Sequence, residues 1–360
     1  MIGIIPKILL YKSFRKLGFP RMKPLNYTVS LCYRCNSRCK TCNIYKKKAE
    51  ELSVKEYKKI FKSLGHSPYW ITFSGGEPFL RTDIVEIVKA AYKICKPAII
   101  NIPSNGILTD KITEDVKNIA LTTRKSKLII NLSFDGIKGQ HDHIRNVAGN
   151  YEKTLKTYNK LKHLKLPNLE VGIHTVISKF NVTDFSAISS KLMSFKPDSY
   201  ITEIAEERIE LDTVGKQISP GLLEYRSAID FLSHRIKNGK FSGISKITQA
   251  FRLEYYNLVK KILRDKTQVI PCYAGFTSVQ ISPDGDVWAC CIKANPVGNL
   301  RETNYNFSEI WNSDKMKIIR RSIKNKECWC PLANAAYTNM LMDIPTDIRV
   351  FYRSFIKWWT

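Results

Sequence analysis

The chain has 360 residues, 44% of them apolar, which suits one large α/β domain with a smaller appendage. No apolar run reaches the roughly 18 residues that a spanning helix needs, and we expect no cleaved secretion signal. The formal charge of +26 favours an anionic partner such as nucleic acid, lipid or substrate, or else marks a solvated lysine-rich surface.

The ten cysteines fall mostly into two groups, one near the start of the chain and one near its end. Secreted disulfide scaffolds are usually shorter and more evenly studded with cysteine. Clustered cysteines in a chain without an export signal are more typical of metal ligands. We therefore expect a cytoplasmic protein that holds metal through thiolates.

In chain order, residues 1–26 are basic with interleaved apolar positions. They predict an amphipathic helix that either lies on an anionic surface or caps one end of a barrel. Strand-like and helix-like segments then alternate over residues 27–205. The strands are expected at 27–31, 70–73, 98–102, 128–134, 169–176 and 200–205. This alternation predicts an α/β fold, a partial (β/α)6 TIM-type barrel with its functional loops at the carboxyl ends of the strands.

The helices between these strands have recognisable beginnings. Ser53 and Glu56 form a capping-box pattern before a helix expected at 54–64, and Thr82 is expected to cap the next helix. Further helices are expected at 110–120, 151–164 and 182–195.

Three segments follow the barrel. Residues 206–271 predict two helices, at 220–237 and 246–265. Residues 272–335 contain a hairpin signal around Pro283-Asp-Gly285 and the second cysteine group. Residues 336–360 form an amphipathic tail in which one helical face carries Ile344, Ile348, Phe351, Tyr352, Phe355 and Trp359.

The first cysteine group contains Cys35, Cys39 and Cys42 in a C-x3-C-x2-C spacing. Three thiolates on an iron–sulfur cluster would leave one iron open to another ligand. By spacing alone the group also suits a partial zinc site. Cys32 lies outside the spacing and is expected to pack near the cluster as an ordinary thiol.

This cysteine spacing resembles the cluster loop of the radical S-adenosylmethionine (SAM) superfamily. Further segments resemble that family's motifs in the same order, and each follows a predicted strand. They are Ser74-Gly-Gly-Glu-Pro78, Ile102-Pro-Ser-Asn-Gly106, Asn131-Leu-Ser-Phe-Asp-Gly136 with His141-Asp-His-Ile-Arg145, and Ile173 to Asn181.

The resemblance implies that Cys35, Cys39 and Cys42 hold a [4Fe–4S] cluster that binds SAM, and that a flavodoxin or ferredoxin reduces it. It implies that Glu77 meets the methionyl ammonium and that Arg145 meets the carboxylate. The other implied SAM-binding residues are Gly75, Gly76, Asn105 and Ser133. Thr41 departs from the aromatic residue that often precedes the third cysteine.

The second cysteine group resembles the family's SPASM domain in its shortened, twitch-like form. The resemblance implies one auxiliary [4Fe–4S] cluster held by Cys272, Cys290, Cys328 and Cys330. Cys291 is the alternative to one of these four ligands, and a zinc ion on the same thiolates is the alternative to the cluster.

The expected activity is reductive cleavage of SAM to a 5′-deoxyadenosyl radical that abstracts hydrogen from a substrate. The auxiliary cluster is expected to accept an electron, which gives a dehydrogenation or a cross-link. The alternatives are a peptide maturase, an enzyme at an anionic membrane surface that acts on lipid or lipid-linked glycan, and a nucleic-acid-binding protein with structural metal sites.

Charged residues 203–208 either face the barrel cavity or form a solvated run.

Overall fold

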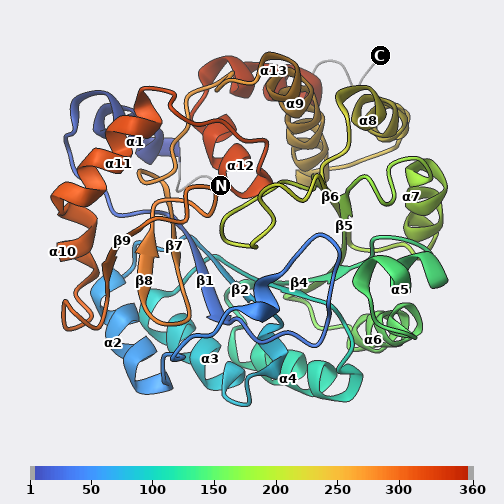
Figure 1. Ribbon diagram of the computed structural model, residues 1–360, viewed down its shortest axis with the longest axis horizontal. Coiled ribbons are helices and arrows are strands. Elements are labelled where there is room, and N and C mark those ends of the chain that lie inside the picture. The colour runs from blue at the N-terminus through green and yellow to red at the C-terminus, as the bar shows by residue number, and fades with distance from the viewer. Residues whose placement is uncertain (1–4, 356–360) are drawn as a thin grey trace.

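The computed structural model describes residues 5–355. Its strands form one nine-stranded sheet in the order β6-β5-β4-β3-β2-β1-β7-β8-β9 (Figure 1). The strands are β1 (Asn26–Cys32), β2 (Trp70–Gly75), β3 (Ile99–Ser104), β4 (Lys127–Ser133), β5 (Leu169–Ile177), β6 (Ser199–Ile204), β7 (Ser278–Ile281), β8 (Asp286–Trp288) and β9 (Pro296–Asn299).

The partial barrel expected from the sequence is confirmed. Strands β1 to β6 pair in parallel with their neighbours in chain order. Helices return the chain along the outer face of this curved sheet (Figure 1). They are α2 (Val54–Leu64), α3 (Ile84–Cys95), α4 (Thr109–Thr122), α6 (Asn150–His163) and α7 (Phe185–Ser194), with the short α5 (Gly139–Arg145) before α6.

The local signals at two helix starts had different outcomes. Ser53 caps α2 through the predicted capping box, with its side chain accepting from the Glu56 amide. The prediction of Thr82 as the next cap is wrong, because the N-cap of α3 is Asp83. The Asp83 carboxylate does not cap the helix and instead accepts hydrogen bonds from Arg81.

The C-terminal strands continue the barrel sheet. β7 pairs in parallel with β1, while β8 and β9 follow antiparallel, so the predicted hairpin lies on the free edge of the barrel. The helices after β6 are α8 (Leu222–Lys237), α9 (Ile244–Asp265), α10 (Phe307–Asn312), α11 (Asp314–Lys324) and α12 (Ala333–Leu341). Of these, α10 and α11 pack against β9, whereas α9 packs against α8 and α12. The first strand, with its cysteine loop, therefore lies at the junction of the two parts.

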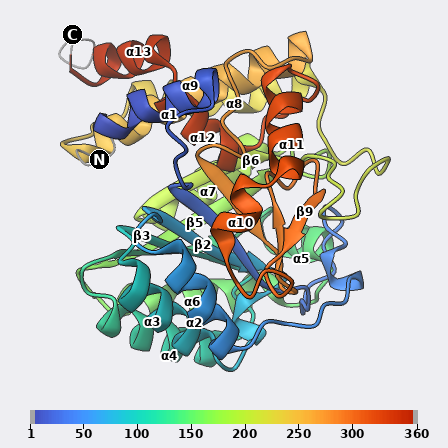
Figure 2. The ribbon, with the colours of Figure 1, turned by 90° about the vertical axis from the view of Figure 1, so that its left-hand side faces the viewer.

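Two terminal helices complete the structure, α1 (Ile5–Leu17) and α13 (Ile344–Phe355). Figure 2 shows them on the same side of the molecule. Trp359 of the predicted tail lies outside the described residues. Within residues 5–355, no helix has the length and apolar character to cross a bilayer.

Candidate functional site

The cysteine loop is the segment between β1 and α2, and it contains the first group of thiols. Two of its amides donate to carbonyl oxygens at the end of α5, and the amide of Asn43 donates to the Leu211 carbonyl in the loop after β6 (2.9 Å). The loop is therefore held by segments that come much later in the chain.

The first-group thiols meet hydrogen-bond donors from other loops. Asn105 donates to Cys35 Sγ (3.9 Å), and the Arg145 guanidinium donates to Cys39 Sγ (3.6 Å). Burial raises the pKa of Cys35 to about 11 and that of Cys42 to about 12. Three thiols on one short loop, with the half-buried cation of Arg145 beside one of them, fit a cluster with one open iron, because thiolate is the ligand that iron–sulfur clusters require.

Gly75 is the last residue of β2 and Gly76 follows it, and both pack against the cysteine loop. A Cβ added at Gly75 would lie 2.2 Å from the carbonyl oxygen of Cys32, and one added at Gly76 would lie 2.1 Å from that of Arg34. Gly75 also has a φ of 123°, which side-chain-bearing residues rarely adopt. The glycines thus allow two backbone segments to approach each other closely.

Glu77 is 1% exposed, and its carboxylate joins two loops. It accepts hydrogen bonds from the amide of Phe79 (3.1 Å), the amide of Asn105 (2.8 Å) and the hydroxyl of Ser104 (3.0 Å). Burial raises the pKa of Glu77 to about 7, against these hydrogen bonds. In the structure the carboxylate holds the loop after β2 to the end of β3 and the residue that follows it.

Ser133 is the last residue of β4, and Arg145 is the last residue of α5, which follows that strand. Arg145 forms an ion pair with the buried Asp135 (2.7 Å) while it contacts the thiol of Cys39. Ser133 is half-buried and pairs in register with His174 on β5. The structure therefore brings Arg145 to the first thiols, and places Ser133 beside the next strand.

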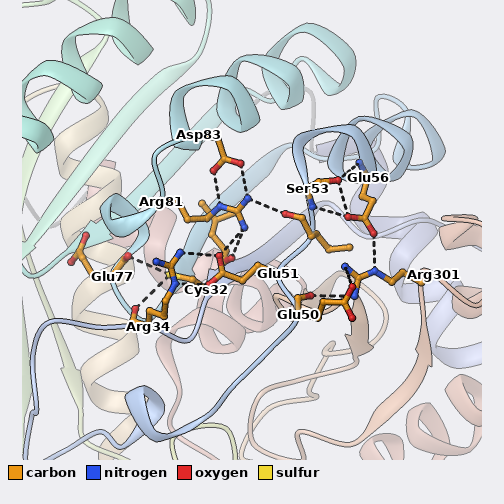
Figure 3. A network of polar contacts seen from close by, with 12 residues as sticks. Cys32, Arg34, Glu50, Glu51, Ser53, Glu56, Glu77, Arg81, Asp83 and Arg301 are labelled. Carbon is orange, nitrogen blue, oxygen red and sulfur yellow. Dashed lines mark hydrogen bonds and ion pairs between the residues drawn. The ribbon is translucent and has the colours of Figure 1, made fainter.

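Arg81, which no sequence motif singled out, links the two ends of the cysteine loop (Figure 3). Its guanidinium donates to the carbonyl oxygens of Leu31 (3.2 Å) and Leu52 (2.9 Å) and forms an ion pair with Asp83 (2.7 Å). Arg81 is 6% exposed. The sequence signal that could have identified it is an arginine five residues after Gly76 with an acid, Asp83, two residues later.

Figure 3 also shows a link from the C-terminal half to the barrel. Arg301 forms an ion pair with Glu56 of the capping box (2.7 Å) and donates to the Glu50 carbonyl oxygen (3.2 Å). The Leu52 amide donates to the carbonyl oxygen of Pro283 in the hairpin turn (2.8 Å). The C-terminal end of the cysteine loop, at residues 50–52, is thus hydrogen-bonded to the C-terminal part of the protein as well as to the barrel.

The second cysteine group converges on one cavity. Four thiols line it, from the segment before β7, the segment after β8 and the segment between α11 and α12: Cys272, Cys290, Cys328 and Cys330. Gln268 donates to the Cys328 carbonyl oxygen (2.8 Å) and lies beside its sulfur. Four thiols around a cavity lined mainly by apolar side chains fit the all-cysteine ligation of a [4Fe–4S] cluster. Among the residues that the structure describes, no three His, Cys, Asp or Glu side chains are grouped to hold a single metal ion.

The structure separates the neighbours Cys290 and Cys291. Cys290 lines the cavity, whereas Cys291 is 5% exposed and accepts a hydrogen bond from Arg208 through its sulfur (3.7 Å). Cys32, also buried, donates to the carbonyl oxygen of Glu77 (3.4 Å), as expected for a packed thiol.

A charged segment at the end of β6 and just after it lies between the two cysteine groups. Glu203 is paired with His174 on β5 (3.5 Å), and Arg208 is paired with Glu210 (3.5 Å). Burial raises the pKa of Glu206 to about 8. Glu207, by contrast, accepts a hydrogen bond at the surface. Most of the run is therefore turned inward, and only part of it is solvated.

Two curated relatives are similar in sequence to this chain over most of its length. Fe-coproporphyrin III synthase of Methanosarcina barkeri is 27% identical over 332 residues, covering 86% of this chain and 79% of the relative. The antilisterial bacteriocin subtilosin biosynthesis protein AlbA of Bacillus subtilis is 23% identical over 329 residues, covering 86% of this chain and 66% of the relative.

Solved structures share the fold. Streptococcus suis SuiB bound to precursor peptide SuiA has a TM-score of 0.64 at 15% identity, covering 89% of this chain and 71% of SuiB. Native anSMEcpe with bound AdoMet and Cp18Cys peptide has a TM-score of 0.60 at 16% identity, covering 92% of this chain and 97% of the other.

Two family models match the two cysteine-bearing parts. The model of the radical SAM superfamily matches residues 29–192, and that of an iron–sulfur cluster-binding domain, SPASM, matches residues 272–331. These domains imply [4Fe–4S] clusters and SAM as cofactors, and the thiols described above fit them. The chain therefore belongs to the radical SAM superfamily and carries a C-terminal SPASM domain.

Proposed function

We propose that this protein removes hydrogen from a substrate held between its two cysteine groups and passes an electron from the substrate to an auxiliary cluster. In this proposal Cys35, Cys39 and Cys42 hold the SAM-binding cluster. The auxiliary cluster is held by Cys272, Cys290, Cys328 and Cys330. The reaction is a dehydrogenation or a cross-link, each of which takes two hydrogen atoms from the substrate.

One observation carries the proposal: the segment after β6 reaches both cysteine groups. The amide of Asn43, the residue after Cys42, donates to the Leu211 carbonyl oxygen in this segment (2.9 Å). Arg208 of the same segment donates to the sulfur of Cys291 (3.7 Å), the residue after Cys290. A short polar segment thus borders both groups, and a substrate bound along it would lie between them.

When bound, the cluster with SAM supplies a 5′-deoxyadenosyl radical for hydrogen abstraction, and the auxiliary cluster supplies an electron acceptor. The chain's own residues do the positioning. Arg145 provides a planar cation at the first thiols, which suits a carboxylate ligand. The Glu203–His174 pair and Arg208 offer hydrogen bonds and charge to polar groups of the substrate. Glu206 provides a carboxyl group at which the proton that leaves the substrate can be held.

A peptide with acidic residues is the substrate class that we propose. Two structures of similar fold contain a peptide, by their descriptions. Relatives include proteins named for maturation, such as the sporulation killing factor maturation protein SkfB and the mycofactocin maturase MftC. The net charge of +26 adds a general attraction for an acidic chain.

Anaerobic reconstitution tests the chemistry. We expect about eight irons per chain, in two [4Fe–4S] clusters, and production of 5′-deoxyadenosine from SAM under reducing conditions. A variant with Cys35, Cys39 and Cys42 changed to Ala should keep about four irons and lose SAM cleavage. Cleavage that persists in this variant would end the proposal.

The second group is tested separately. Changing Cys328 and Cys330 to Ser should lower the iron content while 5′-deoxyadenosine production continues. To identify the substrate, peptides encoded beside the gene are incubated with the intact enzyme, and their masses are then measured by mass spectrometry. The expected product has lost two hydrogen atoms, and the cysteine variant should form much less of it. A two-hydrogen loss at full rate in that variant would refute the role of the auxiliary cluster.

A further inference from the structure

Helix α13 presents its large apolar side chains to solvent. Five large apolar side chains of this helix are exposed, each to the fraction given: Ile344 (48%), Ile348 (62%), Phe351 (59%), Tyr352 (49%) and Phe355 (53%). They recur at helical spacing and so occupy one face of the helix. The opposite, buried face consists of Thr346, Val350 and Ser354. An ordinary surface helix has the reverse arrangement, with its large apolar residues toward the core.

Helix α1 adds exposed apolar residues next to this face. Arg15 of α1 donates to the Cys272 carbonyl oxygen (2.9 Å), and the next amide, that of Tyr273, donates to Asn339 of α12, the helix that leads into α13 (2.7 Å). Leu9 and Leu17 of α1 are 71% and 73% exposed, and Phe19 just after it is 74% exposed. Figure 2 shows both helices projecting on the same side. A patch of this kind on a monomer usually marks an interaction site.

A basic cavity borders α13 on its other flank. It has a volume of about 420 Å³, lies between α8, α9 and α13, and is lined by the cations Arg226, Lys260, Lys261, Arg264, Arg349 and Arg353. Three acids pair with these cations: Glu254 with Arg349 and Arg353, Asp230 with Arg226 and Lys260, and Asp265 with Arg264. Six cations against three acids leave the cavity with a net positive charge, and Lys261 is exposed.

We propose that α13 and α1 dock this protein onto an anionic phospholipid bilayer, with their apolar side chains in the interface and a lipid phosphate in the basic cavity. An amphipathic helix binds such a surface through its buried apolar area together with basic residues that attract anionic headgroups. Both parts are present here on adjacent faces of one helix. The excess of cations makes an anionic surface, and not a second copy of this basic chain, the matching partner.

Docking of this kind leaves the reaction site accessible. Figure 2 shows the terminal helices at one end of the molecule and the cysteine loop, in mid-blue, toward the opposite side. A substrate would therefore reach the mouth of the barrel from the aqueous side. The docking site is independent of the reaction proposed above.

Vesicle flotation of the whole chain tests the proposal. The intact protein should float with vesicles that contain phosphatidylglycerol and remain unbound with vesicles of phosphatidylcholine alone. Changing both Ile348 and Phe351 to Ser should weaken the partition onto anionic vesicles by more than about tenfold, because two exposed apolar side chains are lost. Lys261→Glu should weaken it by at least about fivefold. Leu121→Ser, which alters an exposed residue of α4 (42%), is the matched control and should change nothing.

Other results would overturn the proposal. Equal flotation with neutral and anionic vesicles would show that anionic headgroups do not drive the binding. Binding at the wild-type level in the Ile348/Phe351 double variant would show that α13 does not contact the bilayer. Inorganic phosphate that binds the protein while anionic vesicles do not would show a site for a soluble anion instead. A further result would identify a second copy of the chain as the occupant. In that case sedimentation velocity would show a dimer of the wild type and a monomer of the double variant, and the wild type would not bind vesicles. SAM cleavage, measured in parallel, should be unchanged in all the variants.

Discussion

Arg81 is the residue whose replacement should most affect the cysteine loop. Arg81→Met removes the hydrogen bonds to the carbonyl oxygens of Leu31 and Leu52 and the ion pair with Asp83. The guanidinium is 6% exposed, so its partners lose a buried cation without gaining full access to water. Removing one partner of a buried ion pair costs about 3–5 kcal/mol. We expect a loss of that size in the free energy of unfolding, measured by urea denaturation under anaerobic conditions.

Arg34 provides the matched control. Its side chain is 58% exposed and forms an ion pair with Glu51 (2.8 Å), the same acid that Arg81 also approaches. Exposed pairs contribute less than about 1 kcal/mol, so Arg34→Met should cost no more than that. Arg81→Met should also retain less iron after reconstitution, because both ends of the loop are released. Equal, small losses of stability in the two variants would refute the reasoning.

Three further predictions concern the cap, the second cysteine group and the glycines. The Arg301 guanidinium holds the pKa of Glu56 at about 2, below its usual 4.5, so the carboxylate stabilises the fold above pH 4.5 and this contribution disappears as the pH falls toward 2. Glu56→Gln should therefore cost about 1 kcal/mol at pH 7 and have no effect near pH 2, as pH-dependent urea denaturation would show. Cys290→Ser should reduce the iron of the reconstituted protein by up to about four atoms, whereas Cys291→Ser should leave iron content unchanged; the opposite result would exchange their roles. Gly76→Ala should shift the cysteine loop, since the new Cβ would lie 2.1 Å from a carbonyl oxygen, and iron retention near that of the wild type would contradict this.

The motifs of the first half were predictable because each is local. Thiols at fixed spacing, glycines after a strand and the capping box of Ser53 and Glu56 depend on nearby residues, and parallel strands bring their carboxyl ends to one edge of the sheet. What Glu77 touches was not predictable. Its carboxylate accepts from donors at positions 79, 104 and 105, and the last two lie at the end of β3 and directly after it. Such partners depend on how neighbouring strands pair.

The sequence by itself determined the class of chemistry, the alternation of strands and helices, and the two cysteine groups. Tertiary structure decided which of the adjacent Cys290 and Cys291 faces the thiol-lined cavity, because the two thiols are neighbours in the sequence and only contacts with distant segments, such as that of Arg208 with Cys291, separate them. It likewise joined β7 to the edge of β1. The apolar face of α13 could be recognised from its spacing, but only the packed structure shows that Thr346, Val350 and Ser354 face inward and the large side chains outward.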